Sequence, residues 1–480
     1  MDVDVRALRV TAVNAAPVVA RGRYVLYWMI AARRAAHSFA LDHAIARAVE
    51  LGRPLVVVEA LRVGYPWASD RMHAFVLHGM ADNAAAFATA GVTYLPYVER
   101  VAGEGKGLLA ALAAKACVVV TDEQPGFFLP RMVAAAGAQL PVRLEQVDGN
   151  GLLPLRASAR AWPTAASFRR HLQKTLPPHL VARPSARPFA RLPRALRDAD
   201  LPRAVLRRWP AATSALLAAD RAALAELPID HAIAPAQRGG PEAAEDVLDA
   251  FLERGLSRYG DGRNHPDDEA ASGLSPYLHF GHLSATACWD PSRVAGAKAT
   301  GSREGWWGLP APHEAFLDEL VTWRELGHVF CFHRTDFDQW SALPEWARRT
   351  LDEHAQDPRP EHYTPAQLAA AATADPVWNA AQRQLVATGR MHNYLRMLWG
   401  KKVLEWSPSP RRALATLIEL NNRYALDGRD PNSYCGILWT LGAFDRPWAP
   451  VRPIFGSVRF MSSASTLRKL RMKKYLARWS

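Results

Sequence analysis

The chain has 480 residues, and 49% of them are hydrophobic. Because this length is too great for one hydrophobic core, it predicts more than one domain. It contains no apolar run of about eighteen residues and no N-terminal secretion signal, so we expect a cytoplasmic protein that does not enter a membrane. Its four cysteines are widely spaced and lack the paired spacing of metal ligands, so we expect neither a disulfide framework nor a metal site such as structural zinc.

The formal net charge of +13 favours a polyanionic partner. Segment 452–480 holds eight Lys and Arg residues and no acidic one, interleaved with Phe460, Tyr475 and Trp479. A basic surface that carries aromatic rings favours nucleic acid over membrane as the partner. The alternative is a solvated tail that keeps the protein in solution.

The first 150 residues alternate strands with helices. Apolar runs predict strands at 24–29, 55–59, 92–98, 117–123 and 141–149, and helical periodicity predicts helices at 33–51, 70–90 and 107–116. This alternation indicates a doubly wound, Rossmann-like α/β domain with a parallel sheet, which we assign to 1–180. No Gly-x-Gly-x-x-Gly motif follows the first strand, so an NAD site there has no support.

The next segment, 181–242, is expected to connect two domains. Between residues 183 and 208 it carries eight arginines, two aspartates and repeated prolines, a composition that resists compact packing and breaks helices. From 243 to 480, periodic apolar segments alternate with Pro and Gly turns, and β-like runs are scarce. We therefore expect 243–480 to form an all-helical domain.

Segment 391–439 has an unusual composition, with three tryptophans, four asparagines, a basic helix and an Asp-Gly-Arg-Asp-Pro turn. Trp399 and Trp406 are seven residues apart and therefore share one helix face, while Trp439 closes a later apolar run. The set suggests redox chemistry beside a nucleic acid. The alternative for each tryptophan is a core residue under an amphipathic helix.

Four segments carry a resemblance to a known family: LSPYLHFGHLS from Leu274, FLDELVTWRELGHVFCF from Phe316, MHNYLRMLWGKKVLEW from Met391 and LDGRDPNSYCGILW from Leu426. In this order they resemble the class II cyclobutane pyrimidine dimer DNA photolyases of the photolyase/cryptochrome family. The resemblance implies an N-terminal antenna domain, a long connector and a C-terminal FAD-binding domain. It also implies that light excites fully reduced FAD and that an electron then splits a pyrimidine dimer in DNA.

The resemblance implies a set of flavin contacts. These are Tyr259, Arg263, Asn264, Leu274, Ser275, Tyr277, Leu278, Arg396, Asn421, Asp427, Asp430 and Asn432. Ser275 opens a helix whose amides could receive a diphosphate. Asn421 resembles the asparagine that faces the flavin N5, although Asn432 is an alternative. For Arg396, the alternatives are an ion pair beside the ring and a purely structural salt bridge. Without the resemblance, segment 259–264 would be interpreted as a simple turn.

The predicted lesion contacts lie on two segments. Glu319 and Trp323 are four residues apart, which places them on one helix face. The resemblance implies that Glu319 contacts a carbonyl of the dimer and helps to stabilise its radical anion, while Trp323 and Trp439 cradle the two bases. Met397 packs against the same pocket or is a helix core residue. A lesion flipped out of the duplex could reach such a buried site. With Asn421, these four residues form the predicted catalytic set.

The resemblance also implies an electron-transfer chain for reduction of the flavin. Trp399, Trp378 and Trp406 match the class II triad, with Trp378 in the middle and Trp406 as the outer, most solvated member. Ile437 stands where class I photolyases carry the first tryptophan of a different triad, which favours class II.

The chain departs from the family pattern in several places. His282 replaces a usual glutamine, and Ser433 occupies a glycine position close to the flavin, where it is expected to alter packing or backbone angle. The loop that begins at Ala443 is one residue short. We expect DNA contacts from this loop and the basic C-terminal segment, through Arg446, Trp448, Arg459, Lys469 and Lys473.

A second chromophore of the deazaflavin type is the preferred antenna. Trp28, Met29 and Arg33 follow the first strand, where the fold would place such a ligand, although Trp28 is equally suited to packing. The main alternative function is a cryptochrome-like photoreceptor that binds FAD without repair, and a further one is a light-independent nucleic-acid-binding protein. The expected partner is DNA with pyrimidine dimers, and the expected oligomeric state is a monomer.

Overall fold

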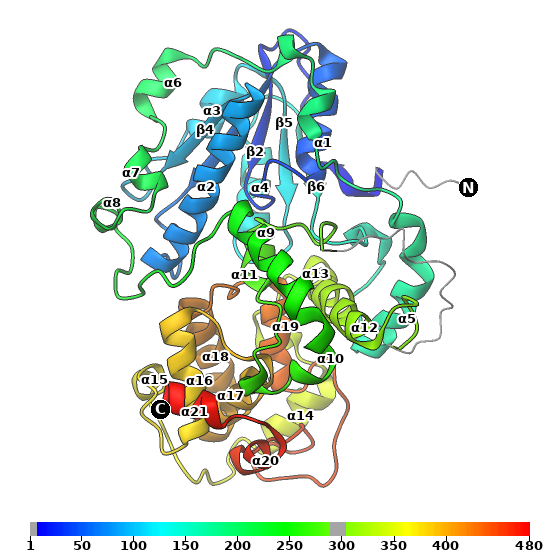
Figure 1. The fold of residues 1–480 in the computed structure, drawn as a ribbon, viewed down its shortest axis with the longest axis vertical. Coiled ribbons are helices and arrows are strands. Elements are labelled where there is room, and N and C mark those ends of the chain that lie inside the picture. The colour runs from blue at the N-terminus through cyan, green and yellow to red at the C-terminus, as the bar shows by residue number, and fades with distance from the viewer. Residues whose placement is uncertain (1–6, 289–303) are drawn as a thin grey trace. The chain divides into compact units, whose positions relative to one another are not determined.

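The computed structural model describes residues 7–288 and 304–480 (Figure 1). They form two compact units, each assembled from separate parts of the chain. The first contains 7–157, 176–248 and 274–288, and the second contains 158–175, 249–273 and 304–480. The boundaries at residues 180 and 242 stay a prediction.

The first unit is built on a six-stranded sheet in the order β1-β6-β5-β2-β3-β4. Its strands are β1 (Val10–Ala12), β2 (Tyr24–Met29), β3 (Leu55–Leu61), β4 (Thr93–Val98), β5 (Ala116–Glu123) and β6 (Leu144–Asp148). All neighbours pair in parallel except β1, which runs antiparallel to β6. Every residue of β2 and β5 is buried, as expected for parallel strands covered on both faces. The predicted doubly wound α/β fold is confirmed.

Helices cover both faces of this sheet (Figure 1). Those of the first unit are α1 (Phe39–Leu51), α2 (Asp70–Ala90), α3 (Leu108–Ala113), α4 (Leu129–Gly137), α6 (Arg203–Arg208), α7 (Ser214–Leu217), α8 (Arg221–Ala225) and α11 (Ser275–His279), and α9 (Pro241–Ala250) contributes residues to both units. The core under one face contains residues of α1 and the end of α2. The core under the other contains residues of α3, α4 and α6.

Local structure in the first unit differs from the prediction at three points. The helix predicted from residue 33 begins at Phe39, because Ser38 caps it by accepting a hydrogen bond from the Leu41 amide. Strand β1 and helix α4 were not predicted. The composition of 183–208 predicted little compact packing, yet Leu192 and Val205 are buried in the cores of the sheet, because apolar residues recur between the arginines.

The second unit is helical, as predicted, and its only β-type pairings among the described residues are isolated bridges. Its α-helices are α5 (Ala165–Thr175), α10 (Tyr259–Gly262), α12 (Ala311–Leu317), α13 (Arg324–His333), α14 (Glu345–Glu353), α15 (Pro365–Ala369), α16 (Pro376–Thr388), α17 (Asn393–Trp406), α18 (Pro410–Tyr424), α19 (Pro431–Thr440), α20 (Ser463–Lys469) and α21 (Lys473–Trp479). Two π-helical segments, Phe251–Gly255 and Asp318–Trp323, complete it.

Short 3₁₀ turns connect the helices and strands of both units. They are Ala7–Arg9, Leu155–Ala157, Pro177–His179, Pro188–Arg191, Arg194–Leu196, Leu256–Arg258, Pro266–Asp268 and Trp340–Ala342.

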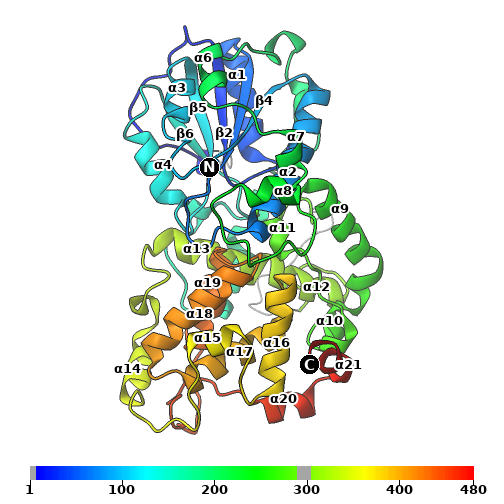
Figure 2. The same ribbon diagram turned by 90° about the vertical axis from the view of Figure 1, so that its left-hand side faces the viewer.

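Two glycines allow the helices of the second unit to approach closely. Helix α19 packs on α13, α17 and α18, and Figure 2 shows it running beside α18. A Cβ at Gly327 would lie 2.7 Å from the Cα of Asn432, and one at Gly400 would lie 2.5 Å from the Cγ2 of Thr440. Any larger residue would push α19 away from its neighbours. These contacts fix the helix that carries Asn432, Ser433 and Trp439.

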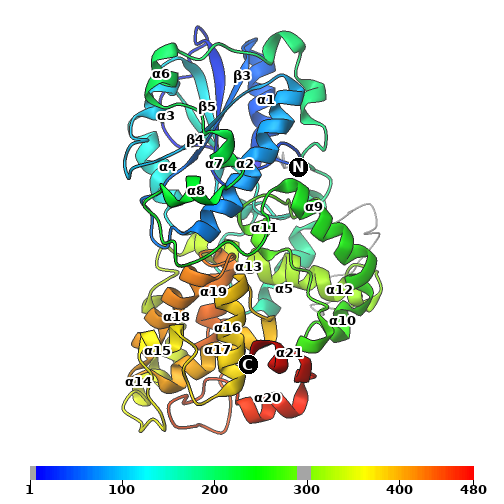
Figure 3. The same cartoon turned by 60° about the vertical axis from the view of Figure 1, so that its left-hand side comes forward.

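The basic C-terminal segment is folded onto the second unit. Helix α21 packs against α16, and Figure 3 shows the two C-terminal helices beside it. Tyr475 is buried, and its hydroxyl donates a hydrogen bond to Gln384. The alternative of a solvated tail is therefore wrong for this part of the chain.

Candidate active site

The π-helical segment Asp318–Trp323 carries the first predicted catalytic side chain. Glu319 accepts a hydrogen bond from Arg263, whose Nη1 lies 2.5 Å from Oε1 of Glu319. The Tyr259 ring lies beside the same guanidinium, with 5.4 Å between its centroid and Cζ of Arg263. Burial raises the pKa of the Tyr259 phenol, which stays neutral. The side chain of Glu319 is 31% exposed, so one carboxylate in a polar cluster faces outward.

Three further predicted lesion contacts are half-buried: Trp323, Met397 and Trp439. Trp439 lies on α19, on the side that also exposes Asn432 and Gly436. A Cβ built at Gly436 would meet no atom within 4 Å. This side of α19 therefore offers a partly apolar surface that other parts of the described chain do not fill.

Two basic side chains lie against the Trp439 ring. Lys401 Nζ lies 5.0 Å from the ring centroid and Arg459 Cζ lies 5.5 Å from it. Lys401 is fully buried, and its ammonium donates to the carbonyl oxygen of Thr440 at 2.7 Å. Burial lowers the pKa of Lys401 to about 7, with a smaller raising effect from Asp445 and a lowering effect from Arg459. The sequence did not single out Lys401, because the WGKKVLEW pattern does not show which lysine points inward.

The predicted flavin contacts around the Asp427–Asp430 turn are joined by polar bonds. Arg396 binds Asp427 through both terminal nitrogens, at 2.9 and 3.3 Å. Asp430 is the N-cap of α19 and accepts a hydrogen bond from the Asn432 amide at 2.8 Å. Asp430 therefore also has a local structural role. The ion pair of Arg396 is present, and its function beside a flavin stays a prediction.

Asn421 lies on α18 and is 3% exposed, whereas Asn432 is exposed. The Nδ2 of Asn421 donates to the Ser433 hydroxyl at 2.9 Å and to Oδ1 of Asn422 at 3.2 Å. Ser433 lies inside α19, and it is absent from the residues with positive φ. The expected effect of Ser433 on the backbone angle is therefore wrong, and the contact of its hydroxyl is with Asn421.

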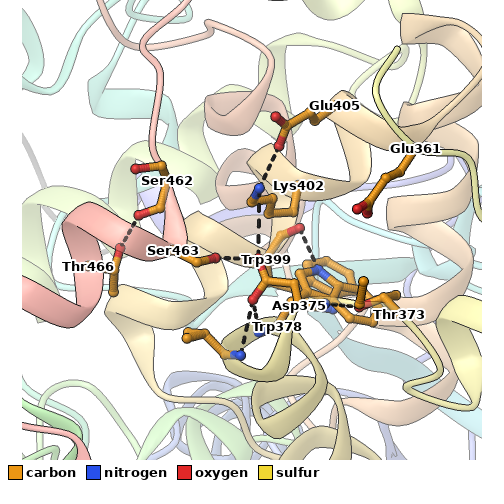
Figure 4. A network of polar contacts seen from close by, with 12 residues as sticks. Glu361, Thr373, Asp375, Trp378, Trp399, Lys402, Glu405, Ser462, Ser463 and Thr466 are labelled. Atoms are coloured by element: carbon orange, nitrogen blue, oxygen red, sulfur yellow. Dashed lines mark hydrogen bonds and ion pairs between the residues drawn. The ribbon is translucent and has the colours of Figure 1, made fainter.

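Trp378, Trp399 and Trp406 form a continuous cluster, of which Figure 4 shows Trp378 and Trp399. Trp378 stacks on Trp399 with 6.3 Å between ring centroids and 5° between planes, and its edge contacts Trp406 at 5.5 Å. The indole of Trp378 donates to the Trp399 carbonyl oxygen, and the indole of Trp399 donates to Gln382. Asp375 begins α16 by accepting the amides of residues 377 and 378, which orients Trp378.

The expected solvation of Trp406 is wrong. Its side chain is 2% exposed, the same as Trp399, because Tyr363 packs edge-on against it with 5.1 Å between ring centroids. Lys402 lies over the same ring at 5.3 Å. Figure 4 shows its ion pairs with Glu405 and Asp375. The cluster is therefore sealed from solvent along its whole length.

Near the loop after Ala443, two arginines lie against the indole of Trp448. Arg446 Cζ lies 4.4 Å and Arg459 Cζ 4.0 Å from the Trp448 ring centroid. Asp445 pairs with Arg459 at 2.8 Å. Arg446 is exposed, and so is Lys473 on α21, while Lys469 Nζ lies 5.3 Å from the Tyr394 ring. These positive groups are suited to phosphate, and their role on DNA stays a prediction.

Four predicted flavin contacts, at residues 274, 275, 277 and 278, belong to the first unit. Helix α11 begins at Ser275 as predicted, and Ser275 is exposed. Leu274 and Tyr277 are buried and Leu278 is half-buried, with the Tyr277 hydroxyl donating to the carbonyl oxygen of Arg238. In the second unit, Asn264 is half-buried after α10.

The predicted antenna residues lie at the carboxyl end of β2. Trp28 and Met29 are its last residues, and both pack in the cores of the sheet. Arg33 pairs with Glu59 at 2.7 Å. The buried positions favour the packing alternative for Trp28. His282 is also buried in this unit, where its Nδ1 accepts the Gly240 amide.

Residues 7–288 and 304–480 contain no group of three or more His, Cys, Asp or Glu side chains able to hold a metal ion. Within the same ranges, no helix has the length and apolar character needed to cross a membrane.

Comparison with known proteins identifies the family. No family model matches the chain. The chain is 34% identical over 475 residues to the deoxyribodipyrimidine photo-lyase of Methanothermobacter thermautotrophicus, covering 99% of this chain and 98% of the relative. It is 35% identical over 467 residues to the enzyme of the same name from Oryza sativa subsp. japonica, covering 95% and 87%.

The fold has a solved counterpart. A bacterial class III photolyase from Agrobacterium tumefaciens superposes with a TM-score of 0.67 at 20% identity, covering 95% of this chain and 86% of that one. The similarity in structure supports the fold, and the nearly full-length similarity in sequence shows that this chain belongs to the deoxyribodipyrimidine photo-lyase family.

Proposed function

We propose that this protein is a light-driven enzyme that splits cyclobutane pyrimidine dimers in DNA with FAD as its cofactor. Curated relatives that match the chain over nearly its full length are named for this activity. The observation within the chain that carries the proposal is the sealed cluster of Trp378, Trp399 and Trp406, whose rings are in continuous contact. Three buried indoles in series form a path for an electron through the helical unit.

The residues of the second unit fit a flavin. Buried polar atoms normally have hydrogen-bond partners, yet Nε of Arg263 and Nδ1 of His392 have none among the described residues. The Arg396–Asp427 pair and the Asn421 amide are further polar groups of this unit that a flavin could contact. Reduced FAD, when bound, supplies the light-excited electron that opens the cyclobutane ring. The protein orients the ring by these donors and acceptors.

The Glu319 cluster is suited to a pyrimidine dimer. Arg263 holds the Glu319 carboxyl at 2.5 Å, so its direction is fixed before substrate arrives. That carboxyl and the Arg263 guanidinium beside it contact a base carbonyl of the dimer and help to stabilise negative charge there. The half-buried rings of Trp323 and Trp439 offer apolar faces against which two flipped bases stack.

Several finer assignments extend this proposal. Ile437 and the contacts of the tryptophan cluster support membership of class II. We retain a deazaflavin-type antenna at the strand ends of the first unit, together with a cytoplasmic location and a monomeric state, as predictions from the sequence. The cryptochrome-like alternative shares the flavin and the tryptophans but has no use for the Glu319 cluster.

A repair assay tests the proposal. The purified protein is fully reduced and mixed with an oligonucleotide that carries one thymine dimer, and intact thymines are measured after blue light and after darkness. We expect recovery only in the light. A protein that shows a normal reduced-flavin spectrum without recovery would instead be a photoreceptor.

A further inference from the structure

Ser433 is a departure from the family motif that bonds to a predicted flavin contact. Its Oγ accepts a hydrogen bond from the Asn421 amide nitrogen at 2.9 Å, and both residues are buried, at 8% and 3% exposure. The bond joins α19 to α18, which are adjacent helices. A serine inside a helix adopts its ordinary backbone angles, so what this residue adds to the site is its hydroxyl.

The orientation of the Asn421 amide follows from its neighbours. The backbone amide of Arg429 donates to a side-chain atom of Asn422 at 2.9 Å, and because a backbone N–H only donates, that atom is the carbonyl Oδ1. The Asn421 atom 3.2 Å from the same Oδ1 must then be the donor nitrogen Nδ2. The second side-chain bond of Asn422 is consistent with this orientation, because its Nδ2 donates to the Tyr434 hydroxyl at 3.1 Å.

Both hydrogens of the Asn421 amide nitrogen are therefore used, one by Ser433 and one by Asn422. Its carbonyl oxygen receives no hydrogen bond from residues 7–288 or 304–480. An amide oxygen that receives no donor from the fold is left to a ligand or to solvent. The side-chain amide of Asn421 can therefore make one further kind of hydrogen bond, in which its oxygen is the acceptor.

We propose that Ser433 is a positioning residue that locks the Asn421 amide so that its oxygen accepts a hydrogen bond from a ring N–H of the bound flavin. This inference rests on the proposed function. The reduced flavin ring carries an N–H at N5, whereas the oxidised ring has only an acceptor there. A locked acceptor therefore favours the reduced cofactor over the oxidised one, and the serine sets that preference without contacting the flavin.

The test compares cofactor affinity in two redox states. Apoprotein is titrated anaerobically with reduced FAD and aerobically with oxidised FAD, and the ratio of the two dissociation constants is taken. In Ser433→Ala the amide keeps only its Asn422 partner and can turn its nitrogen toward the ring. We expect the preference for reduced FAD to fall by about fivefold, the value of one ordinary hydrogen bond. Ser433→Thr, which keeps the hydroxyl, is expected to retain the preference.

The matched control is Ser158→Ala, which removes another buried serine hydroxyl of the second unit, one that accepts from the Trp162 indole at 2.9 Å. Its ratio is expected to equal that of the unaltered protein. An unchanged ratio in Ser433→Ala would overturn the inference, and so would an equal loss of affinity for both redox states. Failure of the unaltered protein to bind FAD or to repair dimers would refute the proposed function itself, a result distinct from an unchanged ratio in a protein that does both.

Discussion

The tryptophan cluster and the Glu319 cluster lie in the same helical unit but are built in opposite ways. Trp378, Trp399 and Trp406 are at most 2% exposed, and the indoles of Trp378 and Trp399 have hydrogen-bond partners within the chain. Glu319 is 31% exposed, and Nε of its partner Arg263 has no acceptor among the described residues. The first cluster is complete as folded, whereas the second has binding capacity to offer a ligand.

This difference assigns the clusters to different steps. An electron path gains from rings packed in fixed contact away from water, and substrate does not need to reach it. A lesion site must instead present polar and aromatic groups to an incoming base. We therefore expect changes in the first cluster to affect reduction of the flavin, and changes in the second to affect repair.

The largest effect is expected from Trp399→Phe. The substitution removes the indole that stacks on Trp378, so the path is interrupted and oxidised flavin is no longer reduced by light in the presence of an external electron donor. Absorbance of the oxidised flavin under illumination measures this. The matched control is Trp307→Phe, which changes another tryptophan of the unit that is 2% exposed and lies outside the cluster. Photoreduction at the unaltered rate in Trp399→Phe would refute the assigned path.

Glu319→Ala is expected to lower the repair yield by about tenfold or more, because a hydrogen bond to a charged group is lost and Arg263 loses its carboxylate partner. The flavin content, read from the absorption spectrum, is expected to stay normal. Glu345→Ala, at an exposed carboxyl of α14, serves as the control. Loss of FAD from the Glu319 variant would reveal a structural role instead of a role in repair.

Lys401 lies under the lesion side of α19, and Lys401→Met is expected to stabilise the protein in a pH-dependent way. The folded-state pKa of about 7 lies below the ordinary value of 10.5, so between these values the unfolded chain holds the proton and the folded protein does not. Stability of the unaltered protein therefore rises with pH across this window. The gain in melting temperature from Lys401→Met should be largest below pH 7 and shrink toward pH 10. A gain that is independent of pH would contradict the buried, titrating lysine.

The smallest effect is expected at the rim of the basic loop. Arg446 is exposed and rests on Trp448, so Arg446→Ala should weaken DNA binding and reduce the slope of log affinity against log salt by about 1. Fluorescence anisotropy at several salt concentrations measures the slope. Arg412→Ala, at an exposed arginine of α18, is expected to leave the slope unchanged. A slope unaffected by Arg446→Ala would remove this arginine from the phosphate contacts.

The sequence predicted the features that depend on local pattern. Continuous apolar runs identified β2 through β5, and the spacing of Trp399 and Trp406 identified a shared helix face. Features that depend on tertiary contact were missed. The bond between Ser433 and Asn421 joins two helices, the burial of Trp406 depends on Tyr363, and the inward direction of Lys401 depends on the position of Thr440. None of these partners is a neighbour in sequence.

The most direct test measures photoreduction and repair on the same preparations of Trp399→Phe and Glu319→Ala. Repair is assayed after chemical reduction, so that it does not depend on the tryptophan path. The account predicts a crossed result, in which the first variant loses photoreduction and keeps repair while the second keeps photoreduction and loses repair. Proportional loss of both activities in either variant would contradict the separation of the two clusters.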